Sequence, residues 1–267
     1  QGGSDFLFGY IGDDVLQGGA GNDSLSGGTG NDRVSYADDT VGVLVDLLGA
    51  AVSGGLATGD FIGYSDIEGA EGGSGNDTLI GTGLANVLLG GGGADSLQGG
   101  LRDDRLEGGA GDDTLFGDAA LFENLHGADT LLGGDGNDVL NGQAGDDLVE
   151  GGAGTDFQSG GAGNDTLSYA GDTTGILLNL LMAIPTFGHA EGDLIVADFE
   201  HFRGGRGADT IIGDARDNVI EGGAGRDSLD GAGGDDLVLG GAGNDTLIGG
   251  GGADSLTGGA DADLFEV

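Results

Sequence analysis

The sequence predicts an all-β fold, a right-handed parallel β-roll or β-helix solenoid. Three observations predict it. A nine-residue period covers most of the 267 residues, glycine supplies 67 of them, and 38 of the 47 acidic residues are Asp rather than Glu. Glycine at this level without a period would indicate disorder, whereas with a period it indicates a repeat architecture. Asp in place of Glu favours tight turns over helices.

The repeat follows the pattern G-G-x-G-x-D-x-U-x, in which U is a large apolar residue, and Gly18–Ser26 is a clean copy. Twenty copies fall into four blocks. Position six is Asp in eighteen copies and Asn in two, and position eight is apolar in all but one, where Gln158 stands. A disordered acidic linker has no use for an apolar residue at a fixed place, so this alternative is rejected. Four copies lack the glycine at position four and carry Leu84, Arg102, Arg216 or Asp261.

Each copy is expected to form a turn at positions one to six and a short strand at positions seven to nine, with the position-eight side chain pointing inward. Two successive copies then make one coil, and each turn lies over the turn of the next coil. This places Asp14 over Asp32, Asp95 over Asp113 and Asp227 over Asp245. Two carboxylates about 5 Å apart repel each other by roughly 3 kcal/mol at an effective dielectric of 20.

A calcium ion between the turns would reverse the sign of that interaction, because Ca²⁺ binds six to eight oxygens, which carboxylates and turn carbonyls supply. Twelve pairs of position-six residues lie one coil apart within a block, so about a dozen Ca²⁺ are expected against a net charge of −40. The expected metal ligands are Asp14, Asp23, Asp32, Asp77, Asn86, Asp95, Asp104, Asp113, Asp129, Asp138, Asp147, Asp156, Asp165, Asp209, Asn218, Asp227, Asp236, Asp245, Asp254 and Asp263.

Two longer aliphatic, strand-rich inserts interrupt the repeats. The expected order is repeats at 1–35, an insert at 36–71, repeats at 72–168 with a short insert at 119–125, an insert at 169–203, and repeats with a closing coil at 204–267. Ser35-Tyr36-Ala37 recurs as Ser168-Tyr169-Ala170, so the chain contains a duplicated unit, about 132 positions long, in one continuous solenoid. The simplest interpretation of each insert is a longer coil; a ligand or partner face is the alternative.

The two asparagines occupy equivalent places in the duplicated units. Asn86 is paired with Asp104 and Asn218 with Asp236, and each asparagine is expected to begin its own side of the stack. Asparagine offers an oxygen without a charge, so these two sites should be weak and fill late in a calcium titration.

The repeats resemble those of the RTX (repeats-in-toxin, haemolysin-type calcium-binding) family. The resemblance implies a non-catalytic module that folds on calcium outside the cell, with the carbonyls of positions one to four as further ligands. It also implies a secreted or cell-surface protein exported by type I secretion, such as an adhesin or toxin-like exoprotein, with flanking domains. A carrier module of a secreted protease, lipase or polysaccharide epimerase is the alternative, and Asp263–Val267 resembles the closing coil of serralysin-like members.

Other classes of function find little support in the residues. The net charge of −40 excludes nucleic acid as a partner, and no apolar run is long enough to span a membrane. No Cys is present, and the three histidines, His126, His189 and His201, form no H-E-x-x-H motif, so neither a catalytic zinc nor an enzyme is expected. A polysaccharide or cell-surface target stays open as a partner, although the seven Arg are explained most simply as local charge relief.

Overall fold

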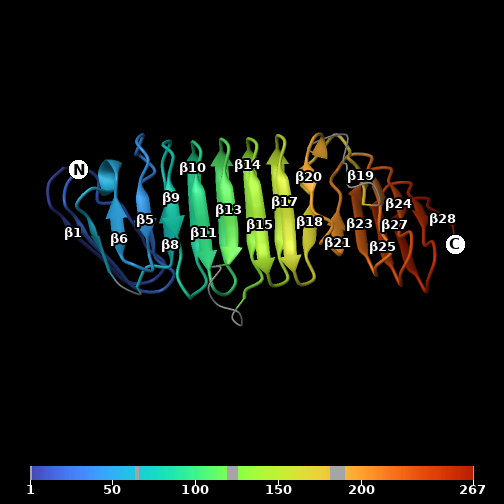
Figure 1. The fold of residues 1–267 in the computed structure, drawn as a ribbon, viewed down its shortest axis with the longest axis horizontal. Coiled ribbons are helices and arrows are strands. Elements are labelled where there is room, and N and C mark those ends of the chain that lie inside the picture. Colours follow the sequence, from blue (N-terminus) through green and yellow to red (C-terminus); the bar gives the residue numbers. More distant parts are fainter. Residues whose placement is uncertain (1, 64–65, 119–125, 181–189, 267) are drawn as a thin grey trace. The chain divides into compact units, whose positions relative to one another are not determined.

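The computed structural model describes residues 2–63, 66–118, 126–180 and 190–266. It divides into two compact units, Gln1–Ala144 and Gly145–Val267, each built from short parallel strands (Figure 1). The predicted all-β solenoid is therefore confirmed, and helix in the described part is limited to short 3₁₀ turns such as η1 (Gly55–Ala57). None of the described segments forms a helix suited to crossing a membrane. The short insert at 119–125, and Leu181 and His189 of the second insert, lie outside the described residues.

The first unit has two facing walls of strands. One sheet contains, in order, β2 (Val15–Leu16), β4 (Arg33–Ser35), β8 (Gly69–Glu71), β10 (Val87–Gly92), β12 (Arg105–Ala110) and β14 (Thr130–Asp135). The opposite wall contains β1 (Phe6–Ile11), β3 (Ser24–Thr29) and β7 (Phe61–Ile62), followed by β6 (Ala51–Ser53), β5 (Leu44–Asp46), β9 (Thr78–Ile80), β11 (Ser96–Gly100), β13 (Thr114–Asp118) and β15 (Val139–Ala144).

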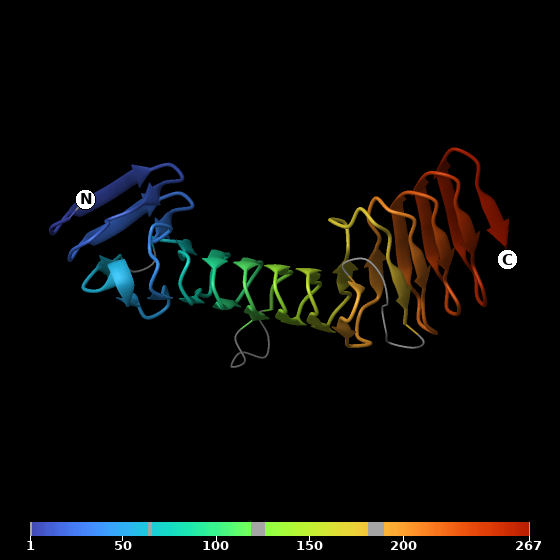
Figure 2. The ribbon, with the colours of Figure 1, turned by 90° about the horizontal axis from the view of Figure 1, so that it is seen from above.

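The second unit repeats this plan. One sheet contains β16 (Leu148–Ala153), β18 (Thr166–Ser168), β21 (His201–Arg203), β23 (Val219–Ala224), β25 (Leu237–Ala242) and β27 (Ser255–Ala260). The opposite wall contains β17 (Phe157–Ala162) and β20 (Leu194–Ile195), then β19 (Leu177–Asn179), β22 (Thr210–Ile212), β24 (Ser228–Asp230), β26 (Thr246–Ile248) and β28 (Leu264–Glu266). Seen from above, the coils of each unit follow one another as separate rungs (Figure 2).

The expected coil of two repeats sets the register of the strands. Leu88 pairs with Leu106, and Val238 with Leu256. The position-eight side chains form the core between the walls and are buried in eighteen of the twenty copies; Leu256 and Phe265, at positions eight of the last two copies, remain partly exposed. The core is thus one side chain wide.

The polar exception in this core is fully hydrogen-bonded. Gln158 is completely buried; its amide nitrogen donates to Asp193 Oδ2 at 3.0 Å, and its amide oxygen accepts a hydrogen bond from the Gly151 N–H at 3.1 Å. A buried amide with these partners avoids the free-energy cost of an unsatisfied polar group. Gln158 therefore extends the core without interrupting the coil.

The inserts leave one wall intact and divide the other. Arg33 of β4 pairs directly with Gly69 of β8, so this sheet passes the first insert without a gap. On the opposite wall, β7 ends one sheet and β5 begins the next, with β6 pairing antiparallel on its outer edge. The second insert has the same effect. Thr166 of β18 pairs with His201 of β21, so one sheet continues past the insert, whereas on the opposite wall β20 ends the sheet that contains β17 and β19 begins another.

Candidate calcium-binding turns

The position-six residues form a hydrogen-bonded ladder along the turns. The N–H of Asp95 donates to Asp113 Oδ1 at 2.8 Å, and the N–H of Asp227 donates to Asp245 Oδ1 at 2.9 Å. Ten of the twelve predicted pairs are stacked in this way, and the other two, Asp129 with Asp147 and Asp138 with Asp156, join residues of different units and stay predictions. One carboxylate oxygen of each of these aspartates therefore holds the preceding coil in register.

The second carboxylate oxygen has no such partner. Oδ2 is buried without a hydrogen bond in ten of these aspartates: Asp14, Asp23, Asp32, Asp95, Asp104, Asp113, Asp165, Asp227, Asp236 and Asp245. A native structure seldom leaves a buried polar atom unsatisfied, and a carboxylate oxygen least of all. A row of such atoms at one motif position is suited to binding cations.

Glycine at position one leaves room beside this oxygen. A Cβ on Gly99 would lie 2.4 Å from Asp104 Oδ2 and 2.5 Å from the carbonyl oxygen of Gly117 in the next coil. The same pair of oxygens meets beside Gly90, where the distances are 2.3 Å to Asp95 Oδ2 and 2.6 Å to the Gly108 carbonyl. Each turn thus offers carboxylate and carbonyl oxygens in a space that any side chain at position one would fill, which suits a hard cation such as Ca²⁺.

The donor set does not suit a transition metal. Within the described ranges, no group of three or more His, Cys, Asp or Glu side chains is arranged to hold a metal ion. The turns instead combine carboxylates with main-chain carbonyls, and oxygen ligands of this type favour Ca²⁺ over Zn²⁺ or Cu²⁺.

Burial raises the pKa of these carboxyl groups. The pKa of Asp104 rises to about 8, and those of Asp95 and Asp129 to about 7, chiefly because the charged form loses its hydration and secondarily because neighbouring carboxylates repel it. The stack is therefore unfavourable as a row of bare anions, and either protons or cations must neutralise it.

Protons should compete with calcium for the turns. The folded pKa values lie above the ordinary value of 3.8, so a folded turn that has not bound its ion takes up protons as the pH falls from about 8 towards 4. Calcium needs the carboxylate, so its binding releases protons. We expect the calcium concentration at half-saturation to rise at least several-fold between pH 8 and pH 5. Calorimetric titrations at the two pH values measure this, and equal midpoints would contradict it.

Four turns that follow the long inserts are closed by their own backbone. The Gly73 N–H donates to Asp77 Oδ2 at 2.7 Å, and the Thr82 N–H donates to Asn86 Oδ1 at 2.6 Å. The equivalent turns of the second unit have the same hydrogen bonds: the Gly205 N–H donates to Asp209 Oδ2, and the Asp214 N–H donates to Asn218 Oδ1. An N–H donor thus occupies the oxygen that stays free elsewhere, so these four positions offer less to a cation than the other aspartates.

The expectation that each asparagine begins its stack is wrong. The amide nitrogen of Asn86 donates to the main-chain oxygen of Glu68 at 2.8 Å, and the N–H of Val219, next to Asn218, donates to the main-chain oxygen of Glu200 at 3.0 Å. A glutamate of the insert therefore precedes each asparagine. The repeat pattern does not reveal these two glutamates, because the inserts lack the glycines that define a copy.

The structure adds stacked residues that the sequence pattern missed. Asp60 and Glu68 accept hydrogen bonds from the N–H groups of Asp23 and Asp32, and Asp193 and Glu200 do the same for Asp156 and Asp165. The sequence contains one indication of these residues, which is that they recur: Asp193 and Glu200 occupy the same places in the second duplicated unit as Asp60 and Glu68 in the first.

The short insert also leaves the stack intact. The N–H of Asp104 donates to Asp129 Oδ1, and that of Asp113 to Asp138 Oδ1, both at 2.8 Å and across the insert. Counting pairs only within blocks therefore missed these two. The first coil likewise begins at Asp5, whose N–H donates to Asp23 Oδ1 at 2.9 Å.

Substitutions within a long stack should affect two turns at once. Asp245 accepts a hydrogen bond from the Asp227 N–H, and its own N–H donates to Asp263 Oδ1 at 3.0 Å. We expect Asp245→Ala to lose two calcium ions, whereas Asp263→Ala, which changes the last pair of its stack, loses one. Native mass spectrometry of calcium-saturated protein counts the ions. Equal losses in the two variants would contradict a ligand shared between neighbouring turns.

The comparison with known families agrees with this geometry. The family model described as the RTX calcium-binding nonapeptide repeat (4 copies) matches residues 1–34, 71–101, 89–120, 127–158, 159–172, 203–238 and 230–265, which is well over half of the chain. No curated protein matches the sequence. The buried aspartate stack, the glycine turns and this match lead to one conclusion: the chain belongs to the family of RTX calcium-binding nonapeptide-repeat proteins.

Proposed function

We propose that the chain is a non-catalytic module that folds when it binds about a dozen Ca²⁺ outside the cell, as a structural or adhesive part of a larger secreted or surface protein. The observation that carries this proposal is the row of ten buried Oδ2 atoms that have no hydrogen-bond partner. A module with this many uncompensated carboxylates is unstable wherever calcium is scarce.

Each part of the repeat has a distinct task in this proposal. Oδ1 of position six fixes the register of the preceding coil, and Oδ2 lies beside a carbonyl oxygen of the following coil and the position-one glycine, as at Asp104 and Gly99. Position eight supplies the narrow core. The calcium ion supplies the positive charge that bridges the turns, and binding energy of this kind counts directly as folding energy.

The calcium concentration that folds the chain tests where it works. A module that stays unfolded during export and folds outside should respond in the range of extracellular modules, about 10⁻⁴–10⁻³ M, rather than in the range of intracellular sensors, about 10⁻⁷–10⁻⁵ M. We expect the midpoint of the far-UV circular dichroism change, in a calcium-buffered titration at neutral pH, to fall in the higher range. A midpoint below about 10⁻⁶ M would count against folding outside the cell.

We also propose that the repeats and the inserts form one continuous solenoid. The repeats are 1–35, 72–168 and 204–267, and the inserts are 36–71 and 169–203. The support is the equivalence of the two inserts. Tyr36 donates to Asp60 Oδ2 at 3.1 Å, and Tyr169 donates to Asp193 Oδ2 at 2.9 Å, so the same residue pair recurs at the same place. Small-angle X-ray scattering of the calcium-loaded chain tests the continuity, since two independently tumbling parts would contradict it.

A further inference from the structure

We propose that the first insert completes a calcium site in which the carboxylate and main-chain oxygen of Asp66 join the preceding repeat's Asp32, and that the equivalent turn of the second insert holds the guanidinium of Arg216 instead of an ion. The proposal rests on the proposed function in one respect, that the repeats bind calcium. It assigns a site to residues 35–70, which the family model leaves unmatched.

Asp32 supplies the buried, unsatisfied atom of this site. Its side chain is 1 % exposed, its Oδ1 accepts a hydrogen bond from the Asp14 N–H at 2.8 Å, and its Oδ2 has no partner. In an ordinary repeat, the free Oδ2 faces a carbonyl oxygen of the next glycine turn. The next turn after Asp32 belongs to the insert and contains no such glycine repeat.

Asp66 provides the missing oxygens. A Cβ on Gly27 would lie 2.4 Å from Asp32 Oδ2 and 2.2 Å from the main-chain oxygen of Asp66, so this carbonyl takes the place of a position-one glycine carbonyl. The Asp66 carboxylate accepts a hydrogen bond from the Ser26 hydroxyl on Oδ2 at 2.6 Å, while its buried Oδ1 has no partner. Two unpaired carboxylate oxygens and one carbonyl oxygen are thus available at a single turn.

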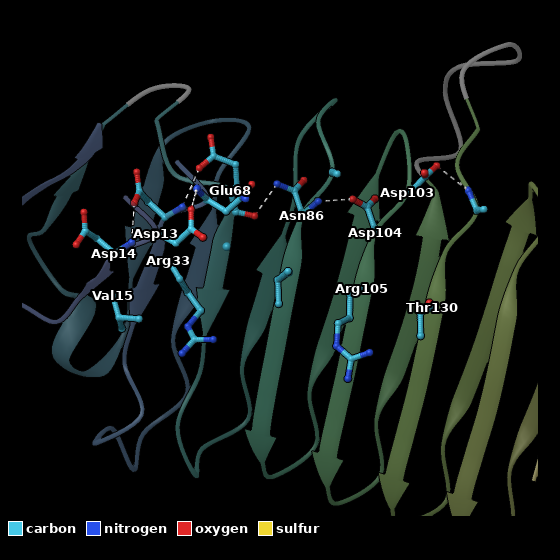
Figure 3. A pocket seen from close by; sticks show the side chains of 16 residues that line it. Asp13, Asp14, Val15, Arg33, Glu68, Asn86, Asp103, Asp104, Arg105 and Thr130 are labelled. Atoms are coloured by element: carbon cyan, nitrogen blue, oxygen red, sulfur yellow. Dashed lines mark hydrogen bonds between the residues drawn. The ribbon is translucent and has the colours of Figure 1, made fainter. Parts of the chain in front are cut away.

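Glu68 holds the register of this turn and adds negative charge beside it. Its Oε2 accepts a hydrogen bond from the Asp32 N–H at 3.0 Å, so Glu68 plays the part of a position-six residue. No Arg or His in the described part of the chain is paired with Glu68. The nearby Arg33 points away along its strand (Figure 3) and pairs with Glu71 at 3.3 Å. This turn therefore combines one free carboxylate oxygen each from Asp32 and Asp66 with the main-chain oxygen of Asp66, and Ca²⁺ would neutralise their charge.

The equivalent turn of the second insert has no room for the same ion. Arg216 donates through Nη1 to Glu200 and through Nη2 to the main-chain oxygen of Phe199 at 2.9 Å. Asp198 accepts hydrogen bonds from the Ser159 hydroxyl at 2.7 Å and from two backbone N–H groups, at 3.2 and 3.1 Å. Both oxygens of Asp198, the counterpart of Asp66, are thus occupied by N–H and O–H donors, while Oδ2 of Asp165, the counterpart of Asp32, stays free.

The two turns differ in several residues, and one difference places a cation beside the insert carboxylates in the second unit only. Arg216 is the counterpart of Leu84 in the duplicated unit, and both occupy position four of the copy that contains the asparagine. Leu84 is exposed and offers no charge. The duplicated unit therefore provides its own comparison: arginine closes one insert turn, and leucine leaves the other open for a cation.

The test counts bound ions by native mass spectrometry of the full, calcium-saturated chain, with circular dichroism to monitor the fold. We expect the Asp66→Asn, Glu68→Gln double variant to bind one ion fewer than the parent. Asp198→Asn is the matched control, because both oxygens of this counterpart of Asp66 already accept hydrogen bonds, from the Ser159 hydroxyl and from two backbone N–H groups, and its count should be unchanged.

Exchanging the position-four residues supplies an independent arm that keeps every carboxylate. We expect Leu84→Arg to lose one ion and Arg216→Leu to gain one, while Leu84→Ala matches the parent. If the double variant loses its β signal, Leu84→Arg decides: a count equal to the parent would overturn the first-insert site. An unchanged count in Arg216→Leu would overturn the role given to the arginine. A parent chain that binds no calcium would instead refute the proposed function.

Discussion

Removing calcium is expected to convert the chain from a β-rich solenoid into a disordered or loosely collapsed chain. The far-UV circular dichroism spectrum in excess chelator should lose its β character and regain it when calcium is restored. The reason is the burial of charge: Asp95, Asp104 and Asp113 are 1–3 % exposed, and each retains an oxygen without a partner. A core one side chain wide cannot offset both this cost and the ordering of a chain with 67 glycines.

Magnesium is the matched control for this experiment. Mg²⁺ has the same charge but requires a small octahedron and keeps several of its waters, whereas the turns offer carbonyls and carboxylates from two adjoining coils. Magnesium at the same concentration should therefore restore much less of the β signal. A spectrum that chelator leaves unchanged, at neutral pH and after dialysis, would refute calcium-dependent folding.

The regular part of the fold could be predicted because two positions of the repeat determine it. Position eight alternates with the turns at a fixed spacing, so the register of the stacked coils follows from the sequence, as the pairing of Leu97 with Leu115 shows. The position-six ladder follows from the same spacing. Even the exception at Gln158 obeys it, because its amide finds partners within the core.

The differences between turns could not be predicted from the repeat itself. Gly72-Gly73-Ser74-Gly75 reads like any other copy, yet its turn is closed by the Gly73 N–H. The cause lies in the preceding insert, where the main-chain oxygen of Asp39 accepts a hydrogen bond from the Ser74 N–H at 2.8 Å. An interaction that spans a whole non-repetitive insert leaves no local signal. The insert carboxylates Asp66 and Glu68 were hidden likewise, since neither stands in a glycine-rich pattern.

The second large effect is expected at glycine position four. Gly92 and Gly93 are neighbours in one run of four glycines, at positions three and four of the copy that contains Asp95. A Cβ on Gly92 would find its nearest atom 3.8 Å away. Gly93 has a φ of +111°, and a Cβ there would lie 2.4 Å from the carbonyl oxygen of Gly75 in the previous coil. A carbonyl held in the solenoid backbone cannot move aside without disturbing the stack.

We therefore expect Gly93→Ala to destabilise the calcium-loaded chain by about 3 kcal/mol, from backbone strain and overpacking together. Gly92→Ala should change the stability by no more than about 0.5 kcal/mol. Thermal unfolding in saturating calcium would show this as a fall in Tm of roughly 6 to 12 °C for the first variant and almost none for the second. Equal Tm values would show that the coils do not approach as closely as the Gly75 carbonyl requires. Alanine already occupies position three in other copies, as at Ala20 and Ala110, whereas the close approach of the Gly75 carbonyl leaves no room for a Cβ at Gly93.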